Sequence, residues 1–191
     1  MSDNKEFIEL LKRGDTRAFS ELVEQYQHFV FNTILSIVQQ FQDAEDLTQE
    51  VFAQVYKSIG NFRGDSKLST WIYRIALTKS LELERKRKAK RTIGFFKNLI
   101  GLEQANLDDK EFHHPGIIMQ QKENAVYLFK ALQCLPENQR IAFVLIKAEG
   151  LSYQEVSAIM NKSVKSIEGL IHRAGENLRQ QLKSYYNENQ Q

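Results

Sequence analysis

The stretch from Ser152 to Arg173, which reads SYQEVSAIMNKSVKSIEGLIHR, predicts two helices joined by a tight turn. Ser152 and Glu155 are spaced as a capping box, in which the serine oxygen accepts from the Glu155 amide and the glutamate carboxylate accepts from the serine amide. A helix therefore begins at Ser152. It runs to Asn161, a residue that tolerates the left-handed conformation that a tight turn between helices requires. We predict a helix-turn-helix over residues 152–180.

The second helix of this pair, which begins near residue 163, divides into an apolar face and an outward face. A helix in this position enters the major groove in many DNA-binding proteins, where a carboxylate such as Glu168 can accept from a cytosine amino group. An ordinary helical hairpin with a solvated outer face fits the same spacing. The candidate DNA contacts are Ser163, Lys165, Ser166, Glu168, His172, Arg173 and Arg179.

Upstream of this motif the periodicity is also helical. Apolar residues recur at threes and fours from Phe19 to Ile59, which is typical of helix faces and not of strands. We expect Asp43 to cap the second helix of this part, Gly60 to end it, and Ser69 to cap a third helix that runs into a basic stretch.

Between residues 93 and 121 the helical periodicity fails, and glycines, paired aspartates and His113-His114-Pro115-Gly116 interrupt the sequence. Apolar spacing resumes after this segment. The sequence therefore predicts an all-α protein with two small helical domains, at 1–92 and 122–191, joined by an irregular linker at 93–121.

Composition excludes several classes of protein. The single cysteine, Cys134, cannot form an internal disulfide, and the first residues show no signal-peptide pattern. The longest strictly apolar run, at 141–146, is far shorter than the roughly 20 residues that cross a bilayer. We expect a cytoplasmic protein without membrane insertion.

The net charge of +2 is small, but the charge is unevenly distributed. Seven basic and two acidic residues lie between Lys79 and Arg91. This stretch continues a helix that carries Trp71 and follows a loop that carries Phe62, and basic charge interleaved with aromatic rings suits phosphates and unpaired bases. The alternatives are a solvated helix end for the charges and core packing for the two aromatic side chains.

A second cluster is acidic. Asp43, Glu45, Asp46 and Glu50 crowd the first turns of one predicted helix. Three explanations remain open: stabilisation of the helix N-terminus, worth about 1 kcal/mol or less per charge, a metal-dependent nuclease site, or docking onto a basic partner. No further motif in the sequence supplies the ligands that a nuclease site needs.

Three stretches together resemble the extracytoplasmic-function group of bacterial sigma factors. They are DAEDLTQEVF at 43–52, NFRGDSKLSTWIYRIA at 61–76, and LPENQR at 135–140 with the helix-turn-helix that follows it. The resemblance implies a non-enzymatic subunit, without cofactor or metal, that brings RNA polymerase to promoters and opens the DNA. The implied partners are the core RNA polymerase, through the clamp of its largest subunit and the flap of its second subunit, together with promoter DNA and an anti-sigma factor.

The resemblance also assigns residues to roles. The polymerase-docking residues would be Asp43, Glu45, Asp46, Leu47, Gln49, Glu50 and Phe52. The residues that bind the downstream element and open the strands would be Asn61, Phe62, Arg63, Lys67, Ser69, Thr70, Trp71, Arg74, Lys79, Arg85 and Lys86. The outward residues of the helix-turn-helix would read the upstream element.

Two glycines depart from the family pattern. Gly169 and Gly175 lie inside the recognition helix, where each costs about 1 kcal/mol relative to alanine. At Gly175 and at Leu170 many members carry a basic residue, so His172, Arg173 and Arg179 would carry more of the phosphate contact.

Two other functions compete with this interpretation. A stand-alone helix-turn-helix regulator would bind duplex DNA without the polymerase and would need no strand-opening loop. A metal site at His113 and His114 beside Asp108 and Asp109 is a weaker possibility, because adjacent histidines do not share a helix face and no spaced ligand pair completes the set.

Overall fold

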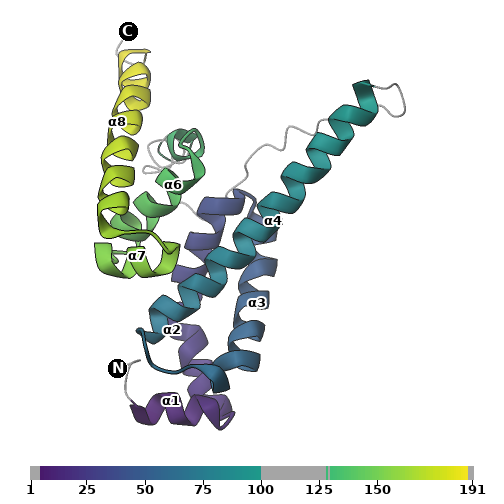
Figure 1. The fold of residues 1–191 in the computed structure, drawn as a ribbon, viewed down its shortest axis with the longest axis vertical. Coiled ribbons are helices and arrows are strands. Elements are labelled where there is room, and N and C mark those ends of the chain that lie inside the picture. Colours follow the sequence, from purple (N-terminus) through teal and green to yellow (C-terminus); the bar gives the residue numbers. More distant parts are fainter. Residues whose placement is uncertain (1–4, 100–127, 129, 189–191) are drawn as a thin grey trace.

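A computed structural model of the chain describes residues 5–99, 128 and 130–188. In this part of the chain every regular element is a helix (Figure 1). The elements are α1 (Lys5–Lys12), α2 (Thr16–Val38), α3 (Phe41–Ser58), a 3₁₀ turn η1 (Ile59–Asn61), α4 (Leu68–Leu99), α6 (Glu137–Phe143), a π-helical turn η2 (Val144–Ala148), α7 (Tyr153–Met160) and α8 (Val164–Glu188).

Helices α2, α3 and α4 form the first unit, with α1 packed across one end (Figure 1). The apolar faces that the periodicity predicted meet in one core, where Leu22, Val30, Ile34, Val51 and Ile72 are fully buried. Asp15 begins α2 by accepting from the amides of Arg17 and Ala18 at 2.9 Å each. The all-helical fold class is confirmed.

Three boundaries differ from the sequence predictions. Helix α3 starts at Phe41 with Gln40 as its N-cap, so Asp43 lies inside the first turn and pairs with Arg87 instead of capping. Helix α4 starts at Leu68, so Ser69 is helical and the amide of Trp71 bonds to the Lys67 carbonyl at 3.2 Å. The helix also continues to Leu99, which makes the first part of the expected linker helical.

The second unit is built on α6, α7 and α8. Val156, Ile159 and Ile167 are buried between the two helices of the helix-turn-helix and α6. A second small cluster joins Ala131 and Leu135 to Ala174 and Leu178 of α8. The predicted metal candidates at 108–114 lie outside the described residues, as does most of the expected linker.

The two units contact each other directly, and α7 packs against α4. One apolar cluster contains Ile37, Tyr73 and Leu77 of the first unit together with Ile141 and Leu145 of the second. Within the described residues, no helix combines the length and the apolar character needed to cross a membrane.

Candidate polymerase and nucleic-acid interfaces

The acidic helix α3 exposes only part of its predicted docking set. Asp46, Gln49 and Glu50 are exposed and Glu45 is half-buried, whereas Leu47 and Phe52 are buried in the core. These two apolar residues therefore hold the helix in place. Glu50 forms an ion pair with Lys79 of α4 at 2.9 Å.

Asp43 pairs within the chain with Arg87, a residue of the basic stretch that the sequence analysis did not single out. Arg87 donates to Asp43, to Gln40 Oε1 at 2.9 Å and to Glu84 Oε1 at 3.2 Å. Partial burial opposes its charge, but the hydrogen bonds to Asp43 and Glu84 outweigh burial and raise the pKa of Arg87. Arg87 therefore anchors α4 to the junction of α2 and α3, while Arg85 and Lys86 remain exposed.

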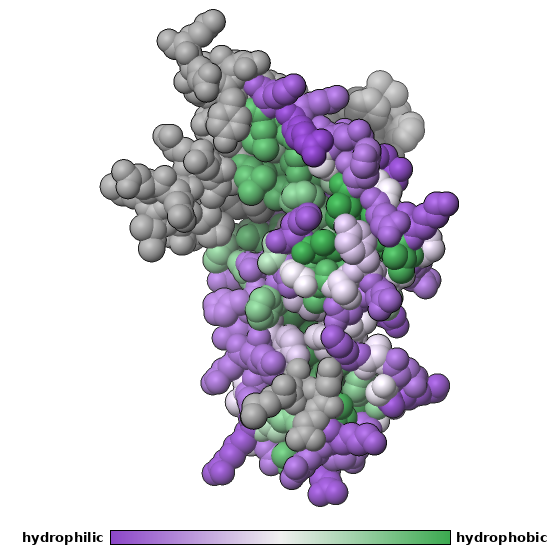
Figure 2. Space-filling view, turned by 90° about the vertical axis from the view of Figure 1, so that its left-hand side faces the viewer, coloured by the Kyte–Doolittle hydropathy of each residue, from purple (hydrophilic) through white to green (hydrophobic). Residues whose placement is uncertain are grey.

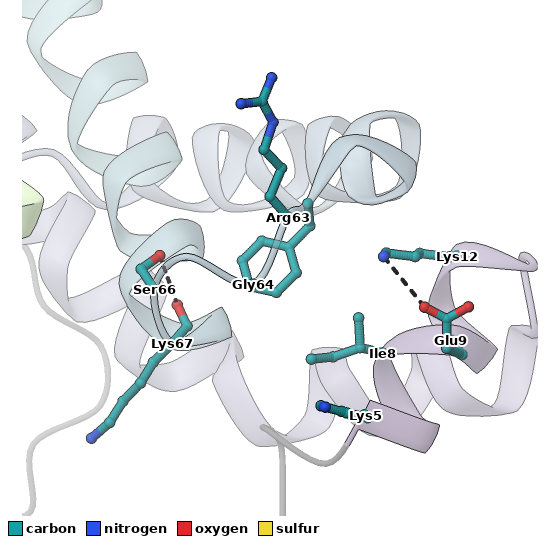
Figure 3. Close-up of a pocket in the computed structure, with 9 residues that line it drawn as sticks. Lys5, Ile8, Glu9, Lys12, Arg63, Gly64, Ser66 and Lys67 are labelled. Atoms are coloured by element: carbon teal, nitrogen blue, oxygen red, sulfur yellow. Dashed lines mark hydrogen bonds and ion pairs between the residues drawn. The ribbon is translucent and has the colours of Figure 1, made fainter.

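The loop between η1 and α4 lies beside a hollow of about 560 Å³. Asn61, Arg63 and Lys67 are exposed on this loop, and Gly64 has a φ of 82°, a conformation that favours glycine. The hollow is lined from two sides, by α1 and by the loop (Figure 3).

Two residues predicted to contact DNA in this region face the core. Phe62 is 5% exposed and its ring lies against Trp71, with centroids 5.4 Å apart. Thr70 is 3% exposed. Neither Phe62 nor Thr70 therefore has an exposed side chain for the predicted contact with DNA. Ser69 and Trp71 are only half-buried.

A second hollow, of about 380 Å³, lies between α3 and α4. It brings Trp71, Arg74 and Lys79 of the predicted downstream set onto one surface, together with Gln54 and Thr78. The one-turn spacing of these residues on α4 explains why they share a face.

Polar contacts join both the loop and this surface to the helix-turn-helix unit. Lys67 Nζ lies 2.8 Å from Glu155 Oε1, and Arg74 Nη2 donates to the Ala158 carbonyl at 2.6 Å. Further along α4, Lys88 pairs with Glu137 at 2.8 Å. Two residues predicted to meet promoter DNA are therefore held against α7.

Two carboxylates in this interface have pKa values shifted in opposite directions. Burial raises the pKa of Glu149 to about 7, although the hydrogen bond from the Tyr73 hydroxyl opposes the shift. Glu149 Oε2 is buried without a hydrogen-bond partner. The hydrogen bond from Lys67 and those from Ser152 lower the pKa of Glu155 to about 2.

The helix-turn-helix forms as predicted. Ser152 Oγ accepts from the Glu155 amide at 3.2 Å, Glu155 Oε2 accepts from the Ser152 amide at 2.9 Å, and Asn161 turns the chain with a φ of 52°. The Ser157 hydroxyl further fixes the turn by donating to the Lys162 carbonyl at 2.5 Å.

Helix α8 presents its predicted DNA contacts to solvent. A Cβ added at Gly169 would lie 3.5 Å from Arg173 Nη1, so the guanidinium folds back along the helix over this glycine. His172 lies 3.4 Å from Glu176. All seven predicted side chains are exposed, namely Ser163, Lys165, Ser166, Glu168, His172, Arg173 and Arg179.

Each of the two units matches a known protein family. Residues 22–92 match the family Sigma-70 region 2, and residues 125–178 match the family Sigma-70, region 4. The ECF RNA polymerase sigma-E factor of Escherichia coli K12 is 33% identical over 88% of each chain. This chain belongs to the extracytoplasmic-function group of the sigma-70 family.

Other relatives agree with this assignment. The RNA polymerase sigma-H factor of Pseudomonas aeruginosa is 34% identical over 91% of this sigma factor and 90% of that one. Two solved structures share the fold at 24% identity. CnrH in complex with the cytosolic domain of CnrY has a TM-score of 0.69 and covers 95% of this chain and 98% of that one. RpoE in complex with the anti-sigma factor NepR from Bartonella quintana has a TM-score of 0.66 and covers 86% and 96%.

The family membership decides between the two functions that the sequence left open. A sigma factor of this group binds core RNA polymerase, recognises promoter DNA and promotes the strand opening that starts transcription. The stand-alone regulator is not supported. The region 2 match covers α3 and the 61–70 loop, and the region 4 match covers the helix-turn-helix.

Proposed function

We propose that the roles of this sigma factor divide between its two helical units, at about 1–92 and 122–191. The exposed acidic side chains of α3 dock the polymerase clamp, the 61–70 loop with the adjoining face of α4 opens the downstream element, and α8 reads the upstream element. The chain itself catalyses no reaction and acts in the cytoplasm with the polymerase.

The proposal depends chiefly on the 61–70 loop. This loop exposes short and flexible polar side chains beside a hollow, and Gly64 leaves open space above its backbone, because a Cβ added there would meet nothing within 4 Å. An unstacked base needs such a recess with hydrogen-bonding groups at its edge. Extruding a base from the duplex costs a few kcal/mol. A base that fits the pocket regains this free energy and a base that does not fit loses it, so sequence discrimination arises during melting.

The contacts of Lys67 and Arg74 with α7 bear on regulation. Each side chain makes a polar contact with α7, and these contacts compete with contacts to DNA. We propose that an anti-sigma partner keeps this factor inactive by stabilising the arrangement in which Lys67 and Arg74 contact α7. One solved structure with the same fold is RpoE in complex with the anti-sigma factor NepR.

The experiment exchanges residues 61–70 for a polar linker of equal length. Binding to core polymerase and to the upstream element should remain nearly unchanged, while permanganate reactivity of unpaired thymines at the start site should disappear. A promoter melted in advance should partly restore transcription. If the exchanged protein opens the same promoters with the same sequence preference, the loop does not capture a base.

A further inference from the structure

Helix α1 contributes one complete face to the hollow beside the loop. Lys5, Ile8, Glu9 and Lys12 line it, and their spacing of three, one and three residues places them on the same side of the helix. Opposite them lie Phe62, Arg63, Gly64, Ser66 and Lys67. Helix α1 lies before the region 2 match, which begins at residue 22.

The side chains of α1 point across this space. In Figure 3, Lys5 and Lys12 extend from α1 toward the loop on either side of Ile8, while Arg63 and Lys67 extend away from it. Lys5 and Lys12 are therefore the positively charged side chains that point toward a ligand bound between α1 and the loop. The space-filling view of one face of the whole molecule shows hydrophilic residues around groups of apolar ones (Figure 2).

The ion pair between Lys12 and Glu9 on this face leaves Lys12 available to another partner. Lys12 Nζ lies 3.3 Å from Glu9 Oε1, and both side chains are partly exposed, at 29% and 57%. Exposed pairs of this kind contribute little to stability and are screened by salt. A phosphate, with several strong acceptor oxygens, can replace the carboxylate as the partner of Lys12.

The dimensions and chemistry of the hollow suit one nucleotide. Its volume of about 560 Å³ falls in the range of sites that hold small molecules. Ile8, which is half-buried, provides apolar surface for a base, and the lysines provide charge for the backbone. Single-stranded DNA is bound in proteins by this combination of an apolar or aromatic platform and a cationic groove.

We propose that α1 is the second wall of the strand-opening site, where Lys5 and Lys12 bind backbone phosphates of the melted non-template strand beside the base that the loop captures. The inference rests on the proposed role of the loop. It adds a helix outside the matched region to the promoter interface.

The test compares the double variant Lys5→Ala/Lys12→Ala with the control Arg13→Ala/Arg17→Ala. The control removes the same charge from exposed positions that do not line the hollow. Each protein is assembled with core polymerase, and its affinity for a single-stranded non-template oligonucleotide spanning the melted segment is measured against salt. Loss of two phosphate contacts lowers the slope of log affinity against log salt by about 1.4. Raising salt from 50 to 200 mM should then weaken the parent about sevenfold more than the double variant.

The outcomes separate this inference from the proposed function. The control and the charge-preserving variant Lys5→Arg/Lys12→Arg should keep the parental slope. If the exchange of residues 61–70 weakens oligonucleotide binding and the α1 double variant does not, α1 is no part of the site although the loop assignment stands. If the double variant instead loses affinity for core polymerase, this face binds protein and the inference is wrong.

Discussion

Lys67 Nζ lies 2.8 Å from Glu155 Oε1, and this ion pair joins the 61–70 loop to the first turn of the helix-turn-helix. The same glutamate completes the capping box with Ser152, so one carboxylate both begins α7 and holds a residue proposed to meet DNA. The ion pair is exposed and contributes little alone. The apolar cluster around Tyr73 and Leu77 buries residues of both units and stabilises their contact through the hydrophobic effect.

Leu77→Asp should separate the two units. Leu77 is 6% exposed and packs in the cluster shared with the second unit, and a carboxylate there costs several kcal/mol when it is buried without a partner. Small-angle scattering should give a larger radius of gyration with helicity retained by circular dichroism. Leu10→Asp, at a position that is 38% exposed, serves as the control and should keep the compact profile. A compact and helical Leu77→Asp protein would show that this cluster does not hold the units together.

The free energy of unfolding should depend on pH through Glu149. Burial raises its pKa in the folded protein to about 7, above the usual value of 4.5, so the folded state binds more protons between these pH values. Stability contributed by the protonated carboxyl is present below about pH 4.5 and is lost as pH rises through about 7. Denaturant titrations between pH 5 and 8 should show this decline in the parent and in the control Glu24→Gln. Glu149→Gln, which stays neutral, should show a flatter profile, and an unchanged slope would contradict the assignment.

Asp43 and the exposed acids of α3 should have different effects on polymerase docking. Asp46→Lys/Glu50→Lys should abolish competition for core enzyme with helicity intact, whereas Glu21→Lys/Glu24→Lys, with the same charge change on α2, should compete normally. Asp43→Ala should instead lower the free energy of unfolding by about 1–2 kcal/mol, because it removes a charged hydrogen bond of Arg87. If Asp46→Lys/Glu50→Lys competes normally for core enzyme, the assignment of α3 as the docking surface is wrong.

Local signals predicted part of this molecule well. The capping box at Ser152 and the turn at Asn161 depend on neighbouring residues, and both formed as expected. The pairing of Asp43 with Arg87 joins positions 44 residues apart, and it competes with the capping role that local propensity suggested. The burial of Phe62 likewise follows from how α4 packs beside the loop. Contacts between the units depend on tertiary packing that no single helix periodicity encodes.

If α8 binds the upstream element as proposed, it should show two classes of contact. Arg173→Ala should weaken binding to all upstream elements and lower the salt slope by about 0.9, as expected for one duplex phosphate. Lys165→Ala and Glu168→Ala should change base preference, because both lie in the first two turns of α8, where a recognition helix contacts base edges. Binding to a library of upstream sequences at several salt concentrations measures both effects. Equal and sequence-independent losses from all three substitutions would exclude base readout at Lys165 and Glu168.

Gly64→Ala should impair strand opening without impairing docking. Gly64 has a φ of 82°, where a residue with a Cβ is strained by about 1–2 kcal/mol, yet the added Cβ would meet nothing within 4 Å. The substitution therefore acts on the loop backbone alone, and the loop should shift away from the shape that admits a base. Permanganate reactivity at the start site should fall, while competition for core polymerase should match the parent. Gly60→Ala is the control, because a Cβ there is equally unobstructed and its φ is not positive. Gly64→Asn should recover part of the activity, since asparagine tolerates positive φ better than alanine. If alanine opens promoters as well as glycine does, the conformation at Gly64 has no part in base capture.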